Sequence, residues 1–262
     1  MMANASGEVR SERVGDVLRL TLSHPGRRNA LTWEMYRQLG DGIMAAADDP
    51  TLAALAIAGT PEEGFAAGTD IGQFAEFDDA ADGLAYERRI GAILEKLQSL
   101  TIPTFALASG AVVGGGLAIA ASCDIIIAER GTRFGVPIAR TLGNCLPSPV
   151  IARLMLRMGT ALTLSMLLTA RLMTAEELAA NGFVQHLVER GELEAEAERM
   201  LARATRGAPL TLRAVKETVQ RIETSLPIPN TDDLLELCYG SSDFAEGVRA
   251  FGEHRKPVWR GV

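Results

Sequence analysis

Cysteine, histidine and long apolar runs are all scarce in this chain of 262 residues. The three cysteines form no CxxC pair and share no ligand spacing with the three histidines, which argues against a disulfide framework or a zinc site. The longest apolar runs, at residues 53–58, 112–121 and 125–128, are too short to cross a bilayer. The N-terminal stretch lacks the apolar core of a signal peptide. We therefore expect a cytoplasmic protein with no metal and no membrane partner.

Positive charge is also in deficit, and several common sequence motifs are missing. The chain has 26 Lys and Arg against 33 Asp and Glu, a formal net charge of −7, whereas nucleic-acid binding needs a surplus of basic residues. No GxxxxGKS/T, GxGxxG or GxSxG sequence occurs, so a P-loop, a dinucleotide fingerprint and a hydrolase nucleophile elbow have no support. The content of 47% hydrophobic and 23% charged residues indicates a globular chain with one sizeable core.

Strand-like and helix-like patterns alternate through the first half of the chain. Strands are expected at residues 9–13, 17–23, 52–58, 104–108 and 124–128. Helices are expected at residues 32–47, 83–100 and 114–123. The helix at 83–100 carries an apolar stripe of helical period, formed by Ile90, Ile93, Leu94 and Leu97. This alternation predicts βαβ units and a mainly parallel sheet, and hence an α/β fold.

The pattern becomes mainly helical after Pro147. Thr174 and Glu177 have the spacing of a capping box, and Gly182 supplies the matching end of that helix. A short strand is expected at residues 183–188, and further helices at 191–206, 209–223, 231–239 and 243–253. We therefore expect one α/β core followed by a helical C-terminal portion.

Two glycine-rich loops share one arrangement, in which a strand leads into the loop and a helix follows it. The first is FAAGTDI at residues 65–71, and the second is SGAVVGGG at residues 109–116. Such loops place unpaired backbone N–H groups at a helix N-terminus, where the helix dipole favours negative charge. Taken alone, either loop also fits the close packing of a helix against a sheet.

Several ordered motifs together resemble the crotonase superfamily of enoyl-CoA hydratases and isomerases. They are RRNALTWEM, FAAGTDI, PTFALASGAVVGGGLAIAASCDIIIA, FGVPIARTLGN and EGVRAFGEHRKPVW, and they span about residues 9–260. The resemblance implies a crotonase-like spiral of ββα units with a helical C-terminal oligomerisation region. It implies a flexible tail at residues 1–8, an acyl-CoA-binding core at 9–200, a helical region at 201–262, and a homotrimer or a hexamer made of two trimers.

The resemblance also implies the roles of individual residues. The backbone N–H groups of Thr69 and Gly115 correspond to the pair that holds the thioester carbonyl and stabilises an enolate or a tetrahedral oxyanion. Residues matched to CoA or substrate binding are Arg28, Ala30, Ala66, Gly68, Asp70, Ile71, Phe251 and Lys256. Among these, Phe251 and Lys256 match residues that a neighbouring subunit offers to CoA. CoA is part of the substrate, so no separate cofactor is expected.

The sequence departs from the family where proton transfer is expected. Hydratases of the family use two glutamates as general acid and base, and here those positions hold Ala118 and Ile138. The acyl pocket is expected to include Ala118, Ile138, Arg140, Asn144 and Cys145. Cys145 is a candidate nucleophile if Arg140 lowers its pKa, although packing is the commoner role of such a cysteine. The acids between residues 76 and 87 are expected to form mostly a solvated face.

The function expected from the resemblance is that of an acyl-CoA enzyme, similar to enoyl-CoA hydratases and isomerases, that stabilises a thioester enolate. The two missing glutamates keep other outcomes of the same intermediate open, namely decarboxylation, thioester hydrolysis and carbon–carbon cleavage. A protein that kept the CoA groove but lost turnover is a further alternative. A peptidase on a related fold is a distant one, because no Ser–His pair is suggested by the sequence.

Overall fold

A six-stranded sheet organises the protein, of which the computed structural model describes residues 7–262. The strands, in spatial order, are β1 (Glu8–Val14), β2 (Val17–Ser23), β3 (Ala54–Gly59), β4 (Thr104–Ala108), β6 (Ile125–Glu129) and β9 (His186–Val188). Every neighbouring pair is parallel except β1 with β2, which confirms the predicted mainly parallel sheet. Of the tail expected at 1–8, residues 1–6 lie outside the described part, and Glu8 already belongs to β1.

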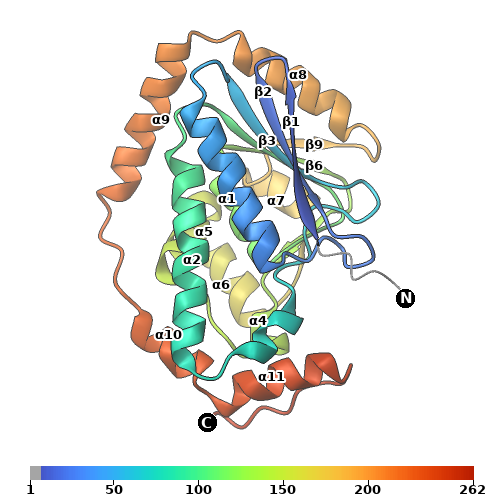
Figure 1. The fold of residues 1–262 in the computed structure, drawn as a ribbon, viewed down its shortest axis with the longest axis vertical. Coiled ribbons are helices and arrows are strands. Elements are labelled where there is room, and N and C mark those ends of the chain that lie inside the picture. Colours follow the sequence, from blue (N-terminus) through green and yellow to red (C-terminus); the bar gives the residue numbers. More distant parts are fainter. Residues whose placement is uncertain (1–6) are drawn as a thin grey trace.

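Helices cover both faces of this sheet. On one face lie α1 (Trp33–Asp48), α2 (Ala80–Ser99) and α3 (Gly115–Ser122), and α8 (Leu193–Thr205) covers the other (Figure 1). Strand β3 shows how the core is divided between the two faces of the sheet, because its side chains point alternately to one face and to the other. Leu55 and Ile57 belong to the larger core with α1 to α3, whereas Ala54 and Ala56 pack toward Leu201 of α8. The expected boundary between residues 200 and 201 therefore falls inside a helix that packs on the sheet.

A second, three-stranded sheet lies beside the first and was not predicted. It consists of β5 (Ala111–Val113), β7 (Arg133–Gly135) and β8 (Met173–Thr174), with β5 parallel and β8 antiparallel to β7. Between β7 and β8 lie the helices α4 (Ile138–Thr141), α5 (Ser148–Met158) and α6 (Thr160–Thr169), and α7 (Ala175–Asn181) follows β8. The predicted capping box of α7 is confirmed, since the Thr174 hydroxyl accepts from the Glu177 N–H and the Glu177 carboxylate accepts from the Thr174 N–H.

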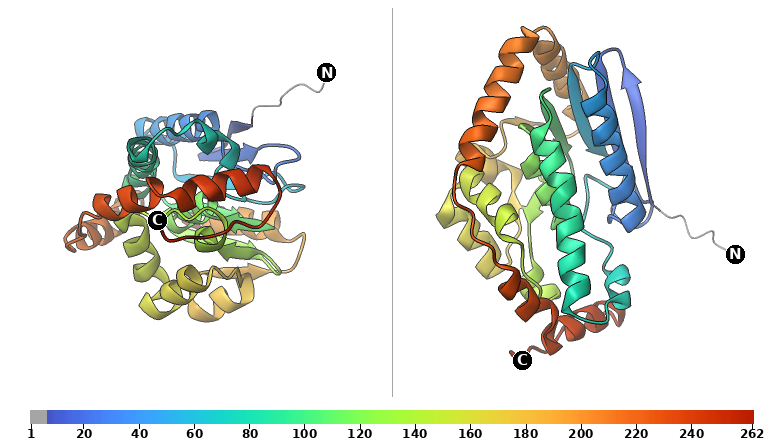
Figure 2. Two further views of the ribbon diagram at one scale, coloured as in Figure 1. Left: turned by 90° about the horizontal axis from the view of Figure 1, so that it is seen from below. Right: turned by 60° about the vertical axis from the view of Figure 1, so that its left-hand side comes forward.

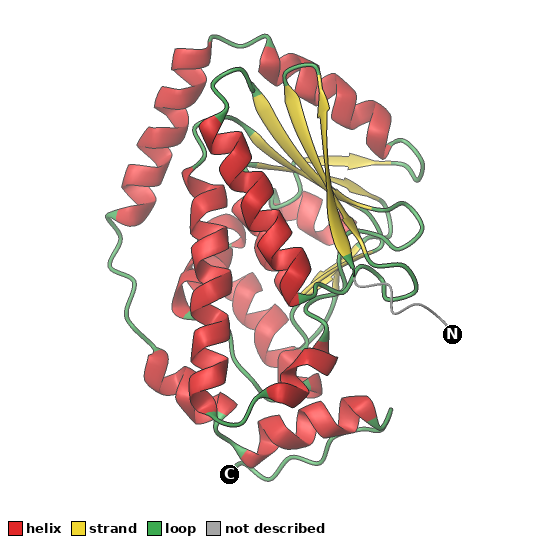
Figure 3. Ribbon diagram, in the orientation of Figure 1, coloured by secondary structure: helices red, strands yellow, loops and turns green. Residues whose placement is uncertain are grey.

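The C-terminal portion wraps around the end of the molecule that lies away from the main sheet. Helix α9 (Pro209–Thr224) runs along one side, and a linker then leads to α10 (Asp232–Tyr239) and α11 (Ser242–Gly252). Figure 2 shows α11 crossing the molecule when it is seen from below, and Figure 3 shows that this end is built from helices and loops. Helix α10 packs against α2, and α11 packs against the short 3-10 helix η1 (Ile71–Glu76). Within residues 7–262, no helix is both long and apolar enough to span a membrane.

Candidate active site

The two glycine-rich loops lie side by side and are joined by backbone hydrogen bonds. The N–H of Ala66 donates to the carbonyl of Ala111 at 2.9 Å, and the N–H of Val113 donates to the carbonyl of Ala66 at 3.0 Å. Gly116 allows this approach, because a Cβ at that position would stand 2.5 Å from the carbonyl oxygen of Ala66. Gly68 and Gly114 both adopt positive φ, at 114° and 52°, where a side chain would be strained. The glycines therefore permit close contact between the two loops.

This arrangement leaves two neighbouring backbone N–H groups without partners. Leu31 donates to the carbonyl of Gly68 and accepts from the N–H of Asp70, so the intervening N–H of Thr69 is directed away from Leu31. Gly115 is the first residue of α3, where an N–H has no acceptor inside its own helix. Within residues 7–262 neither the Thr69 nor the Gly115 N–H has a hydrogen-bond acceptor. The predicted pair of donors thus lies on adjacent loops and is free to bind an oxygen atom.

Thr69 is held in place by the buried Tyr36 and the partly buried Tyr86. Its hydroxyl shares hydrogen bonds of 2.8 Å with the hydroxyl of Tyr36, from α1, and with that of Tyr86, from α2. Burial raises the pKa of Tyr36 to about 12 and raises that of Tyr86 well above its usual value. Both phenols therefore stay neutral near pH 7, and this chain of hydroxyl groups fixes the first loop against α1 and α2.

An apolar cavity of about 230 Å³ opens beside the two donors. Thr69 and Gly115 line it together with the predicted pocket residues Ala118, Ile138 and Asn144. Its other lining residues include Ile71, Phe74, Ile90, Leu94, Val150 and Phe251. A second cavity of about 480 Å³ shares part of this wall and extends outward between α2, α5 and α10. A thioester carbonyl bound to the two donors would therefore have room for its acyl group in an apolar space.

Two of the residues expected in the acyl pocket do not line this cavity. Arg140 is exposed on α4, and Cys145 donates its thiol hydrogen to the carbonyl of Leu234 at 3.5 Å. Burial raises the pKa of the Cys145 thiol to about 12, with Cys238 beside it adding to the shift. A nucleophilic cysteine needs the opposite shift, so the environment of Cys145 does not suit that role.

One acidic residue that the sequence suggested only as part of a solvated face belongs to the site. Glu87 of α2 lines both cavities, and it is the only charged residue among those that line the inner one within residues 7–262. Burial raises the pKa of its carboxyl group to about 7, and a hydrogen bond from the Tyr239 hydroxyl, at 2.5 Å, partly offsets this shift. The signal was present in the sequence, because Glu87 precedes Ile90 by three residues and Leu94 by seven, on the apolar stripe of the helix.

The residues matched to CoA binding lie on or near the two glycine-rich loops and differ in how exposed they are. Gly68, Ile71 and Phe251 line the inner cavity of their own chain, and Ala66 is buried below it. Asp70 caps η1 through its carboxylate, which accepts from the N–H of Gly72 at 3.1 Å. Arg28 and Lys256 are exposed, Ala30 is partly buried, and Lys256 lies beyond the end of α11.

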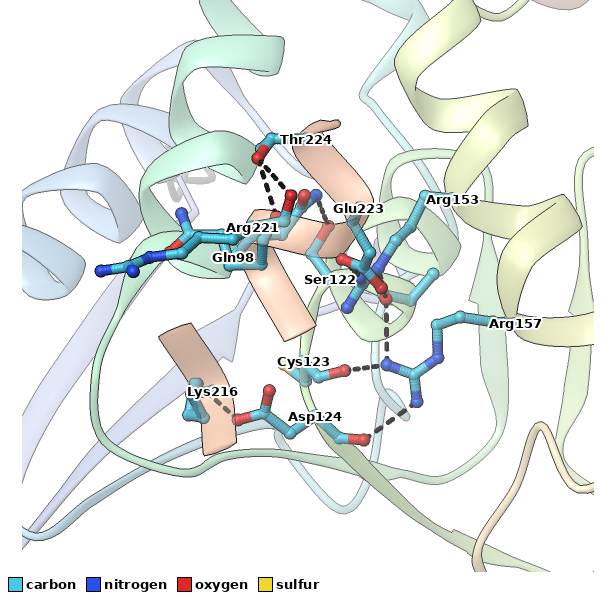
Figure 4. A network of polar contacts seen from close by, with 12 residues as sticks. Gln98, Ser122, Cys123, Asp124, Arg153, Arg157, Lys216, Arg221, Glu223 and Thr224 are labelled. Atoms are coloured by element: carbon cyan, nitrogen blue, oxygen red, sulfur yellow. Dashed lines mark hydrogen bonds and ion pairs between the residues drawn. The ribbon is translucent and has the colours of Figure 1, made fainter. Parts of the chain in front are cut away.

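Helix α3, which carries Gly115 at its start, is anchored at its other end by two arginines. Arg157 donates to the carbonyls of Ala121, Cys123 and Asp124, and Arg153 donates to the carbonyl of Ala121 at 2.9 Å. Arg153 also forms an ion pair with Glu223 of α9 (Figure 4). Cations at a helix C-terminus stabilise its dipole and satisfy carbonyls that have no partner within the helix. These contacts hold the helix that presents the Gly115 N–H.

Known proteins resemble this chain along almost its whole length. A family model described as enoyl-CoA hydratase/isomerase matches residues 12–262. A carnitinyl-CoA dehydratase from Salmonella typhi is 30% identical over 261 residues, which cover 95% of this chain and 97% of the relative. An enoyl-CoA hydratase/carnithine racemase from Magnetospirillum magneticum has a similar crystal structure, with 31% identity, a TM-score of 0.80, and coverage of 97% of this chain and 96% of that one.

A methylmalonyl-CoA decarboxylase, solved in complex with 2-nitronate-propionyl-CoA, superimposes with a TM-score of 0.88 at 25% identity and covers 97% of this chain and 99% of its own. The family match runs through both glycine-rich loops and the helical C-terminal portion, and the crotonase-like α/β fold is confirmed. The chain is therefore a member of the enoyl-CoA hydratase/isomerase family, within the crotonase superfamily of enzymes.

Proposed function

We propose that this enzyme binds an acyl-CoA thioester and stabilises its enolate between the backbone N–H groups of Thr69 and Gly115. The observation that carries the proposal is the pair of unpartnered donors beside an apolar cavity, with one of them at a helix N-terminus. Enolate formation moves negative charge onto the thioester oxygen, and donors already in place stabilise that charge without reorganising. The relatives named above act on thioesters of CoA, which supports this substrate class.

The CoA part of the substrate is proposed to lie across the loops next to the donors. Ala66, Gly68, Asp70 and Ile71 would line the adenine groove, with Ala30 close by. Arg28 and Lys256 would contact the phosphates, and both are exposed, as a phosphate contact requires. Phe251 would close the cavity over the acyl group, since it lines that cavity in its own chain.

Hydratase/isomerase-like chemistry is preferred over decarboxylation of a malonyl-type thioester. A malonyl-type substrate carries a carboxylate, and burying that charge without a cationic partner is costly. Within residues 7–262 no lysine or arginine lines the inner cavity, and the one charged group there is the acidic Glu87. Decarboxylation, thioester hydrolysis, carbon–carbon cleavage and thioester binding without turnover are the alternatives.

The first test follows crotonyl-CoA in D₂O, with enoyl absorbance and deuterium at the α-carbon as readouts. We expect tight thioester binding together with loss of enoyl absorbance or with α-deuteration. If crotonyl-CoA shows neither loss of enoyl absorbance nor α-deuteration, but a malonyl-type thioester is turned over, decarboxylation would be favoured instead. Binding of acyl-CoA with no turnover of enoyl, malonyl, β-keto or branched thioesters would favour the binding protein. An absence of thioester binding would contradict the proposal as a whole.

We also propose that the chain assembles as a homotrimer or a hexamer. Helix α9 supports this proposal, because it exposes a row of apolar side chains, namely Leu210, Val215, Val219 and Ile222. Exposed apolar patches of this kind mark surfaces that bind another protein chain. Light scattering coupled to size-exclusion chromatography should give three or six times the chain mass of 27.9 kDa.

A further inference from the structure

Helix α2 supplies a carboxyl group to the cavity in which the thioester is proposed to react. We propose that Glu87 is the proton-transferring residue of this enzyme and replaces the glutamates that are absent at Ala118 and Ile138. The proposal rests on the function proposed above. Its first support is position, because Glu87 and Ala118 line the same two cavities, and Thr69 and Gly115 line the inner one with them.

The small side chain at position 118 makes this placement possible. Ala118 lies on α3, in the first turn after Gly115, and α3 packs against α2. A methyl group in place of a longer acid leaves the space between the two helices open to the carboxyl group from α2. In this scheme the acid comes from α2 rather than from α3, and it faces the same cavity as the two backbone donors.

The carboxyl group is oriented by two residues from distant parts of the chain. The side-chain amide of Asn144 donates to the hydroxyl of Tyr239 at 2.9 Å, and this hydroxyl donates to Oε1 of Glu87 at 2.5 Å. Within residues 7–262 the other oxygen, Oε2, has no hydrogen-bond partner. One oxygen is thus fixed, and the other is available to a substrate. Tyr239 and Asn144 are positioning residues in this scheme.

The surroundings of Glu87 suit a group that both takes and returns a proton. The buried phenols of Tyr86 and Tyr239 and the thiol of Cys145 all have raised pKa values, so they remain neutral near pH 7. The neighbouring Arg88 is exposed and pairs with Asp232 of α10 at 2.9 Å. With the pKa of Glu87 raised to about 7 by burial, both of its protonation states are populated at neutral pH.

The proposed step is a proton transfer between carbon and Glu87. The carboxylate takes a proton from the α-carbon, the C–H electron pair becomes the carbon–carbon double bond of the enolate, and the carbonyl π pair moves onto the oxygen held by Thr69 and Gly115. The carboxylic acid then returns the proton to the α-carbon or, when the substrate carries a β,γ double bond, to the γ-carbon of the resulting dienolate. No oxidant, reductant or metal is needed for this exchange.

The test measures by mass spectrometry how fast the α-hydrogens of butyryl-CoA exchange with D₂O. Calorimetry measures the affinity for the same thioester in parallel. Glu87→Gln should lower the exchange rate at least about 100-fold, because general acid–base catalysis is typically worth 10²–10⁴. Its affinity for butyryl-CoA should stay within about threefold. Glu87→Asp should retain measurable exchange. Glu198→Gln, which makes the same change at an exposed position on α8, should match the unmodified protein.

Tyr239→Phe separates positioning from simple packing. Its hydroxyl lowers the pKa of Glu87, so its removal should move the acid limb of the exchange–pH profile to higher pH. An acid limb that stays at the same pH in Tyr239→Phe would overturn the positioning role. Exchange by Glu87→Gln at the unmodified rate, or thioester binding without exchange in the unmodified protein, would overturn the role of Glu87. A failure of the unmodified protein to bind butyryl-CoA would instead overturn the proposed function.

Discussion

At the scale of single residues, Gly115 is the position where the smallest change should have the largest effect. A Cβ added there would collide with the hydroxyl of Tyr36 and would stand 3.3 Å from Oγ1 of Thr69. We predict that Gly115→Ala displaces Tyr36, breaks its hydrogen bond to Thr69 and moves the backbone donor. Loss of one such donor typically lowers kcat by about 10²–10³. Steady-state kinetics on a thioester that the unmodified enzyme turns over will measure this loss.

Gly252→Ala is the matched control for this substitution. A Cβ at position 252 would meet no atom of residues 7–262 within 4 Å, and the residue ends α11. Its kcat should equal that of the unmodified enzyme. Equal activity of the Gly115 and Gly252 variants would contradict the role assigned to the second glycine-rich loop.

Residue chemistry that depends on short local sequence was predictable here, whereas chemistry that depends on distant neighbours was not. The two loops are recognisable because strand, glycine and helix are contiguous in each, and the resemblance to the family assigned Thr69 and Gly115 within them. Glu87 gave a weaker signal, because a carboxyl group on an apolar stripe shows burial but does not show what surrounds it. Its hydrogen-bond partner Tyr239 lies 152 positions away, and no local pattern joins the two.

At the scale of elements, the stability of α3 depends on the cations at its C-terminus. We predict that Arg157→Met lowers the free energy of unfolding by about 3 kcal/mol, because the carbonyls of Cys123 and Asp124 lose a charged donor in a partly buried place. Urea denaturation will measure the change. Arg203→Met, at an exposed position on α8, should change the free energy of unfolding by no more than about 0.5 kcal/mol.

The long helices and strands were predicted from the sequence, whereas the shortest strands were not. The long helices and the strands of the main sheet lie within a few residues of their predicted bounds, although α2 begins at Ala80 rather than at Gly83 because Asp79 and Asp82 form a capping box. The strands β5, β7 and β8 have only two or three residues, too few for a recognisable alternation. They form because β7 pairs with β5 on one side and with β8 on the other, and these segments are distant in the sequence.

At the scale of the whole molecule, burial of Glu87 should make stability depend on pH. The folded-state pKa, about 7, exceeds the ordinary value of 4.5, so between these values the folded chain holds a proton that the unfolded chain has released. Raising the pH through this window therefore weakens the fold, by about 3 kcal/mol. Glu87→Gln removes this dependence. Its advantage in unfolding free energy over the unmodified protein should grow by that amount from about pH 4.5 to about pH 7.5.

The comparison between variants cancels the contributions of all other titratable groups to the free energy of unfolding. Glu198→Gln should show no growing advantage, because that carboxylate is exposed. A constant difference between Glu87→Gln and the unmodified protein across the window would mean that the Glu87 carboxyl group titrates at its ordinary pKa.

The hydrogen bond from Tyr239 to Glu87 has a consequence for how the enzyme is made. During synthesis on the ribosome, both glycine-rich loops and α2 emerge well before α10. Until α10 has emerged, Glu87 lacks the Tyr239 hydroxyl that donates to its Oε1, and α2 lacks the helix that packs against it. The hydrogen-bonded surroundings of Glu87 are therefore complete only when translation is nearly finished.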